Sequence, residues 1–296
     1  MADHHAIRKP QAQHQRVEEQ AAAEYLVMYQ EMLSKALRFY WGNLKGSIKA
    51  RRYLKERGVT AESVRRFGLG YAESASQSLR AIFPNYHVKA LVDSGLVVAV
   101  EEGRRRYDRF RDRIIFPILS ESGRVIAFGG RLLEGEGAKY LNSPQSALFD
   151  KGATLFGLPQ ARASIEAQGE VIVVEGYMDV VMSAQHGINN TVATLGTATT
   201  SAHVQKLMST PARRIVFCFD GDGAGLNAAV KAMEACIEVV TATSAEVAFA
   251  FLPETEDPDS FIRNKGADAF REFVSKAVPF ETFLIDQLRR GKDLTT

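Results

Sequence analysis

Short apolar runs alternate with helical segments through the second half of this 296-residue chain. The apolar runs cover 171–174, 190–195, 215–219 and 247–252, and helical patterns cover 180–186, 201–208 and 227–240. Runs this short and this continuously apolar indicate strands that are buried on both faces. We therefore predict an α/β fold here, with a mainly parallel sheet flanked by helices.

The first half of the chain has a different pattern, which predicts a mixed α+β subdomain. Apolar residues recur at three- and four-residue spacing from Ala21 until Gly42 breaks the helical run. Helices are also predicted over 48–57 and after a Thr60 cap, and we expect helix to dominate as far as Val100.

A β-hairpin is predicted after this helical region. Its strands cover 114–119 and 125–128, the turn between them is Ser-Glu-Ser-Gly, and Gly129 and Gly130 end the second strand. A change of domain is expected within 143–157, where the chain becomes linker-like.

These patterns divide the chain into four predicted segments. Residues 1–20 are polar and rich in Gln and His, which indicates a flexible tail. A basic subdomain over 21–150, a parallel-sheet domain over 151–265 and a helical segment over 266–296 follow.

Composition excludes several classes of protein. Lys plus Arg (37) nearly balance Asp plus Glu (35), so any electrostatic signal must be local. Two cysteines form neither a disulfide framework nor a zinc ribbon, and we expect no zinc. No apolar run reaches the roughly 18 residues of a membrane span, and the N-terminus lacks a signal-peptide core. We therefore expect a cytoplasmic protein with no membrane partner.

Carboxylates gather directly after three of the four predicted strands. They are Glu175, Asp179, Asp220, Asp222, Asp257 and Asp259. Because the carboxyl ends of parallel strands share one edge of a sheet, we expect these groups to converge. Converging carboxylates repel one another unless protons or a cation neutralise them, and oxygen ligands favour Mg²⁺ or Mn²⁺ over zinc. The alternative is a set of surface groups in which Asp179 and Asp222 merely cap helices.

The basic signal lies upstream, in residues 104–113. This stretch holds six Arg and two Asp, a net charge of +4, with Tyr107 and Phe110 interleaved. Exposed aromatics among cations are typical of surfaces that bind single-stranded nucleic acid. The alternative is a solvated strand edge with Arg–Asp pairs and aromatics in the core.

Several motifs resemble those of a known family. Residues 174–181 resemble the first motif of the Toprim domain in its bacterial DNA primase form, and 195–200 resemble its second loop. The later acidic motifs of that domain resemble 219–225 and 256–259. The flanking segments 109–118, 128–131 and 139–144 resemble the bacterial primase core in sequence and order, and the likeness extends over about 48–262.

The resemblance implies an RNA polymerase that makes short RNA primers from NTPs on a single-stranded DNA template. It implies that Glu175 is the catalytic acid or base, that Asp220 and Asp222 hold Mg²⁺, and that the other three aspartates support the metal and nucleotide. It also implies a basic groove for template and nucleotides. By this resemblance the groove residues are Arg66, Arg131, Lys139, Tyr140 and Asn142. From the basic stretch we add Arg109 and Arg111 as candidate nucleic-acid ligands.

We expect two features of the full-length family to be absent from this sequence. They are the zinc ribbon, which two cysteines cannot form, and the C-terminal domain through which full-length members bind the replicative helicase. A Toprim nuclease, with water as the nucleophile, and a non-catalytic nucleic-acid-binding recombination adaptor are the alternatives. The primase-like motif at 139–144 argues against the nuclease, and the complete acidic set argues against the adaptor.

Overall fold

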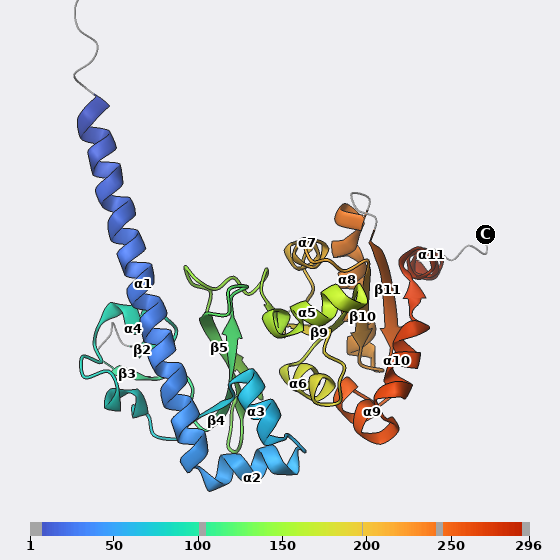
Figure 1. Cartoon of the computed structure of the whole chain (residues 1–296), viewed down its shortest axis with the longest axis horizontal. Helices are drawn as coiled ribbons and strands as arrows, with labels where there is room; N and C mark the ends of the chain where they lie inside the picture. The colour runs from blue at the N-terminus through green and yellow to red at the C-terminus, as the bar shows by residue number, and fades with distance from the viewer. Residues whose placement is uncertain (1–7, 101–104, 197, 241–244, 292–296) are drawn as a thin grey trace, which may run out of the picture.

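The computed structural model describes residues 8–196, except 101–104, together with 198–240 and 245–291. Two sheets organise these residues (Figure 1). A four-stranded antiparallel sheet, in the order β1-β4-β5-β6, forms the centre of the N-terminal half. A six-stranded sheet, in the order β12-β11-β10-β8-β9-β7, forms the centre of the C-terminal half.

The first helix, α1 (Arg8–Gly46), is longer than predicted at both ends. The prediction of a tail over 1–20 was wrong from Arg8 onward, because Gln, Glu and Ala favour helix; residues 1–7 lie outside the described residues. The predicted break at Gly42 was also wrong, since one glycine in a helix costs only about 1 kcal/mol. The N-terminal part of α1 projects away from the rest of the molecule (Figure 1).

Two further predicted helices, α2 (Ile48–Glu56) and α3 (Ala61–Phe67), are confirmed, with Thr60 as the N-cap of α3. Helix dominates to Val100 as expected, but the part after Phe67 is mixed and contains two strands that were not predicted. That stretch contains β1 (Gly70–Ala72), a short 3₁₀ helix (Ser78–Ala81), α4 (Lys89–Asp93) and β2 (Val97–Val100). The β1 strand exists because it pairs with β4, a distant partner that local spacing cannot reveal.

The predicted hairpin is present as β4 (Arg113–Leu119) and β5 (Val125–Leu132). However, β5 continues through Gly129 and Gly130. A Cβ atom on Gly129 would overlap the ring of Tyr177, so the glycine makes room for a neighbour and does not end the strand. Beside this hairpin, β6 (Tyr140–Asn142) pairs with β5, and β3 (Arg105–Asp108) pairs with β2 in a separate ribbon.

The C-terminal sheet confirms the α/β prediction. Its four central strands are parallel: β8 (Glu170–Val174), β9 (Thr191–Thr194), β10 (Arg214–Phe219) and β11 (Glu246–Phe251). Two short antiparallel strands, β7 (Leu155–Phe156) and β12 (Val278–Pro279), close its edges. Because β12 lies within 266–296, that segment is not purely helical as predicted.

Helices cover both faces of this sheet (Figure 1). They are α5 (Leu158–Gln168), α6 (Tyr177–Gln185), α7 (Ser201–Met208), α8 (Gly223–Val240), α9 (Pro258–Lys265), α10 (Ala267–Ser275) and α11 (Phe280–Gly291). Val171 and Val173 face one core, whereas Ile172 and Val174 face a second core that continues into the N-terminal sheet through Phe116. The two halves therefore share a hydrophobic core.

Both cysteines are core residues, as predicted, with Cys218 1% exposed and Cys236 fully buried. The strand β6, which ends at Asn142, belongs to the four-stranded sheet, and β7, which begins at Leu155, belongs to the six-stranded sheet. The chain therefore passes from one sheet to the other in the region where a change of domain is expected. No helix in the described part of the chain is long and apolar enough to cross a membrane.

Candidate active site and its basic flank

The acidic residues lie at the carboxyl ends of neighbouring parallel strands. Glu175 follows β8 and Asp220 follows β10, and these strands pair directly. On the other side of β10, the chain leaves β11 and reaches Asp257 at the start of α9. Adjacent strands are about 4.8 Å apart, so the strand ends bring these carboxylates to one edge.

Backbone groups hold two of these carboxylates in place. The N–H of Asp220 donates to the Glu175 carboxylate, and the N–H of Asp259 donates to that of Asp179. A Cβ atom on Gly176 would lie 2.5 Å from Oδ2 of Asp179, so the glycine leaves room for this carboxylate beside the turn. The local sequence Glu-Gly-x-x-Asp thus lets Asp179, in the first turn of α6, share a site with Glu175.

The pKa values of the central carboxylates are raised. Burial and, secondarily, Asp257, Asp220 and Asp259 raise the pKa of Asp179 to about 8. Burial, followed by Glu175 and Asp257, raises the pKa of Asp220 to about 7. Both shifts disfavour negative charge, so the cluster is set to take up protons or a cation.

The remaining acidic residues belong to the same electrostatic cluster. Burial and then Asp222 raise the pKa of Glu175. Burial also raises the pKa of Asp259, although Arg263 forms an ion pair with it at 2.8 Å. The structure therefore brings together all six carboxylates that the sequence singled out.

Two of the six carboxylates, Asp222 and Asp257, also cap helices. The alternative of carboxylates that merely cap helices therefore applies to them in part. Asp222 Oδ1 accepts from the N–H of Gly225 at 2.8 Å, near the start of α8. Asp257 Oδ1 accepts from the N–H of Ser260 at 2.6 Å and caps α9. Asp179 does not cap its helix, since Gly176 is the N-cap residue of α6. A carboxylate has several lone pairs, so a capping carboxylate keeps oxygens for another ligand.

The donor set fits a hard divalent cation. Glu175 Oε1 is buried without a hydrogen-bond partner among the described residues. A buried, unpaired carboxylate oxygen among groups with raised pKa values is one that a cation would stabilise. The side chains are not assembled around a metal position, however, because no group of three or more His, Cys, Asp or Glu within the described ranges is so arranged.

Three of the predicted basic-groove residues lie beside these carboxylates. Lys139 is exposed, and its positive charge opposes the rise in the pKa of Asp220. The Arg131 guanidinium lies 5.0 Å from the Tyr140 ring centroid, and its Nε donates to the Tyr53 hydroxyl at 2.8 Å. Burial is the main reason why the pKa of Tyr140 rises to about 12, and the nearby Asp179 charge adds to it.

Asn142, another residue of the predicted groove, makes a hydrogen bond with each end of its side-chain amide. Its Oδ1 accepts from the Tyr177 hydroxyl at 2.7 Å, and its Nδ2 donates to the carbonyl of Leu195 at 2.8 Å. Both ends of the amide are therefore used to join β6 to the parallel-sheet domain.

The arginine stretch is partly structural. Phe110 is 1% exposed, so the alternative of an aromatic in the core holds for it and its ring is not available to bases. Arg113 is buried and donates to the carbonyls of Gly130 and Ala138, which supports the loop before Lys139. Arg104 lies outside the described residues.

The other two predicted arginines of this stretch differ in exposure. The Nε of Arg109 donates to the backbone carbonyl of Asn142 at 3.0 Å, so this side chain is half-buried in the N-terminal subdomain. The exposed Arg111 guanidinium lies 4.6 Å from the Tyr107 ring centroid. Arg111 is therefore the more accessible of the two cations.

Arg66 is not brought to the carboxylates. Its Nη1 donates to Asn189 Oδ1 at 2.8 Å, and Asn189 precedes β9, at the opposite edge of the sheet. Sequence reasoning missed Arg57, whose charge acts on both Tyr140 and Asp259 and whose Nε is buried without a described partner. The signals that could have identified it were its place just before Gly58, where the predicted helix ends, and the extension of the family resemblance through Arg57 and Gly58.

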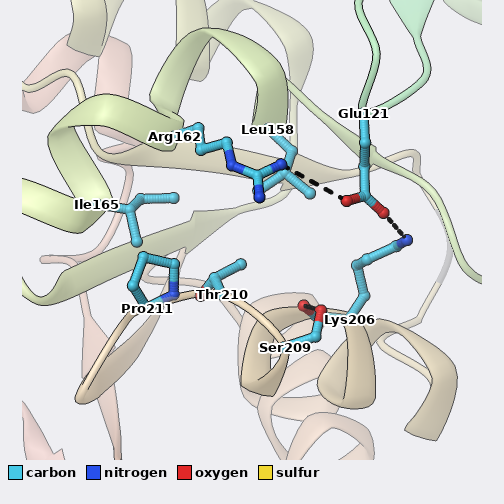
Figure 2. Close-up of a pocket in the computed structure, with 8 residues that line it drawn as sticks. All are labelled: Glu121, Leu158, Arg162, Ile165, Lys206, Ser209, Thr210 and Pro211. Atoms are coloured by element: carbon cyan, nitrogen blue, oxygen red, sulfur yellow. Dashed lines mark hydrogen bonds and ion pairs between the residues drawn. The ribbon is translucent and has the colours of Figure 1, made fainter.

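A second polar contact joins the two halves away from the carboxylates. Glu121, in the β4–β5 turn, lies between Arg162 of α5 and Lys206 of α7 (Figure 2). The Glu121–Arg162 distance is 3.7 Å, and Lys206 lowers the pKa of Glu121. About half of the Glu121 side chain is exposed (51%), so solvent screens this pair.

Comparison with known proteins gives two family matches. Residues 39–162 match the N-terminal domain of the DNA primase catalytic core, and residues 169–246 match the Toprim domain. Among curated proteins, the DNA primases of Neisseria meningitidis and Escherichia coli K12 are 46% and 41% identical over 87% of this chain. The chain spans less than half of these relatives, 43% and 45% of their lengths.

Solved structures agree with these matches. A DNA primase domain from Pseudomonas aeruginosa is 45% identical, with a TM-score of 0.85, and the match covers 90% of this chain and 85% of that one. A DnaG primase catalytic domain bound to single-stranded DNA is 38% identical, with a TM-score of 0.85 and coverage of 93% and 86%.

Proposed function

The chain belongs to the family of bacterial DNA primase catalytic cores, and we propose that it is a DNA-dependent RNA polymerase that synthesises short RNA primers on single-stranded DNA. In the proposed reaction, a 3′-hydroxyl attacks the α-phosphate of an incoming NTP and pyrophosphate leaves. The observation that carries this proposal is the carboxylate cluster with raised pKa values directly beside Lys139, Arg131 and Tyr140.

We assign Glu175 as the acid or base that moves a proton during nucleotidyl transfer. Its pKa is raised by burial, which brings a carboxyl group closer to the pH at which proton transfer is efficient. Asp220 and Asp222 are the proposed Mg²⁺ or Mn²⁺ ligands, with Asp179, Asp257 and Asp259 completing the acidic set. Toprim primase cores depend on metal, and a bound divalent cation stabilises the charge that develops on the transferred phosphate.

The proposed path for template and nucleotides runs along the basic flank. Lys139 and Arg131 supply cations next to the carboxylates, and Arg111 extends the positive surface. The relative bound to single-stranded DNA supports a single-stranded partner. We replace Arg66 by Arg57 in this set, because Arg57 lies near Tyr140 and Asp259.

The test is primer synthesis by the purified chain. Single-stranded DNA, labelled NTPs and Mg²⁺ or Mn²⁺ should give short RNA, and Asp220→Asn should abolish it. Asp268→Asn, at a fully exposed carboxylate on α10, is the matched control and should leave synthesis unchanged. DNA that becomes shorter would instead support the nuclease, and DNA bound without any product would support the adaptor.

A first prediction concerns Glu175. Glu175→Gln keeps the side-chain volume but removes the transferable proton, so synthesis should fall by roughly 10²-fold or more. Fluorescence anisotropy with labelled single-stranded DNA should show unchanged template binding. Synthesis at the wild-type rate would exclude Glu175 as the acid or base.

A further inference from the structure

A hollow between α1, α2 and α3 has no role in the proposed reaction. It is open to solvent, has a volume of about 400 Å³, and its floor is aliphatic. Leu44, Leu54 and Val59 are each less than 10% exposed and form the deepest part, with Trp41 and Val64 beside them. Apolar hollows of this kind on a protein surface mark sites where other molecules bind.

Four cations surround this floor. Lys45 comes from α1, Arg51 and Lys55 come from one face of α2, and Arg65 comes from α3. All four are exposed. None of them forms an ion pair with any described residue, and no acidic residue lines the hollow. In a chain with a net charge of only +2, this is a local concentration of unpaired positive charge.

We propose that this hollow is a docking site for an acidic amphipathic helix of a partner protein. The aliphatic floor matches apolar side chains at i, i+3, i+4 and i+7 of a helix, as in other helix-in-groove complexes. The four cations would face the acidic side chains that flank such a stripe.

Single-stranded nucleic acid fits this surface less well. Nucleic-acid grooves of that kind present successive aromatic side chains on which bases stack. Here Trp41 is the one aromatic residue that lines the hollow, and Lys45 Nζ already lies 5.2 Å from its ring centroid. The deepest side chains are aliphatic and offer no stacking face.

Trp41 makes the test direct, because it is the only tryptophan in the chain. The probe is a synthetic helical peptide with leucines on one face and glutamates on the other. Titration should change the tryptophan fluorescence saturably, and the affinity should fall as salt rises. A second peptide, with serines in place of the leucines and the same charge, should bind at least about tenfold more weakly, because it lacks the apolar face.

Charge reversal at one of the four cations around the hollow, and at a lysine elsewhere, gives a matched pair of variants. Lys55→Glu should weaken peptide binding at least about fivefold, because it replaces an attraction with a repulsion. Lys231→Glu, at an exposed lysine of α8 far along the chain, should leave the affinity unchanged.

Three results would overturn the proposal. They are an unchanged tryptophan signal with the leucine–glutamate peptide, equal affinity in the Lys55→Glu and Lys231→Glu variants, and displacement of the peptide by oligo(dT). The last result would assign the hollow to nucleic acid.

Discussion

Asp179 and Asp220 have raised pKa values for two reasons that act together. Burial removes water from each carboxylate, and the neighbouring carboxylates repel a second negative charge. With pKa values of about 8 and about 7, these residues are partly protonated near neutral pH in the absence of a cation. A divalent cation would displace those protons, so metal affinity should rise with pH.

Burial raises the pKa of these carboxylates but lowers that of a histidine. His203 is fully buried at the start of α7. Its Nδ1 lies 3.3 Å from the N–H of Thr200, and its Nε2 lies 3.1 Å from the carbonyl of Lys151. One nitrogen must accept and the other must donate, which is the pattern of a neutral imidazole. Burial is the main reason why the pKa of His203 is lowered from 6.5.

The second prediction follows from this neutral histidine. Unfolded His203 takes up a proton as the pH falls through its ordinary value of 6.5, whereas folded His203 does so only at lower pH. The free energy of unfolding should therefore fall on acidification below about pH 6.5, by at most about 1.4 kcal/mol per pH unit from this group. His203→Gln should remove that part of the slope.

Chemical denaturation at about pH 7.5 and about pH 5.5 measures this effect. His87→Gln is the control, because His87 is exposed, and it should keep the wild-type pH dependence. The assignment to His203 fails if both variants lose stability with acid as steeply as the wild type.

The third prediction concerns Lys139, the exposed cation in the proposed path whose charge acts on Asp220. Lys139→Ala should weaken binding to single-stranded DNA and make the salt dependence shallower, by about 0.7 in the slope of log K against log salt for one lost phosphate contact. Lys231→Ala should change neither quantity. An unchanged slope in Lys139→Ala would remove this residue from the nucleic-acid path.

At the scale of elements, the turn from β10 into α8 positions two of the proposed metal ligands. A Cβ atom on Gly221 would overlap the carbonyl oxygens of Leu252 and Pro253, and one on Gly225 would overlap the carbonyl oxygen of Asp220. The chain thus packs against itself where Asp220 leaves the strand. Gly221 and Gly225 are therefore required by close backbone approach, whereas Gly223 of the same motif is not.

The fourth prediction tests that turn with two glycines of the same motif. Gly225→Ala should lower the free energy of unfolding by about 1–3 kcal/mol through overpacking and should displace Asp220, so that primer synthesis is lost. Gly223→Ala has no atom within 4 Å of the added methyl group and should be close to neutral. Denaturant unfolding and primer synthesis measure both variants. Equal effects of the two substitutions would contradict the close-approach argument.

At the scale of the whole molecule, two polar contacts of different character join the N-terminal subdomain to the parallel-sheet domain. Tyr177 is buried and donates to Asn142, and its ring stacks on Phe116 at 5.0 Å. Glu121 reaches Arg162 and Lys206 from an exposed turn (Figure 2). Burial determines which contact contributes more to the free energy of unfolding. Loss of a buried hydrogen bond costs more than loss of an ion pair that solvent screens.

The fifth prediction compares the two contacts. Tyr177→Phe leaves Asn142 Oδ1 without its partner and should lower the free energy of unfolding by about 1–2 kcal/mol. Glu121→Gln should change it by less than about 1 kcal/mol. Urea titrations of both variants measure the free energy of unfolding. A larger decrease for Glu121→Gln would mean that the exposed contact contributes more than the buried one to the stability of the interface between the two halves.

The sequence by itself determined the parallel sheet and the acidic edge. Local spacing distinguishes helix from strand, and the order of strand, carboxylate and helix places Glu175, Asp220 and Asp257 at one edge of any parallel sheet. The same local logic located the β4–β5 hairpin and the Thr60 cap of α3. These features depend on residues close together in the chain, so a single sequence reveals them.

Only the tertiary structure decided which polar residues accompany that edge. Arg57 lies near the carboxylates and Arg66 does not, Asn142 joins two domains, and Phe110 is buried in the core. Each outcome depends on partners that are distant along the chain, such as Tyr177 and Asn142, which are 35 positions apart. The physical reason is that burial and hydrogen bonding are set by non-local packing, which periodicity along the chain does not encode.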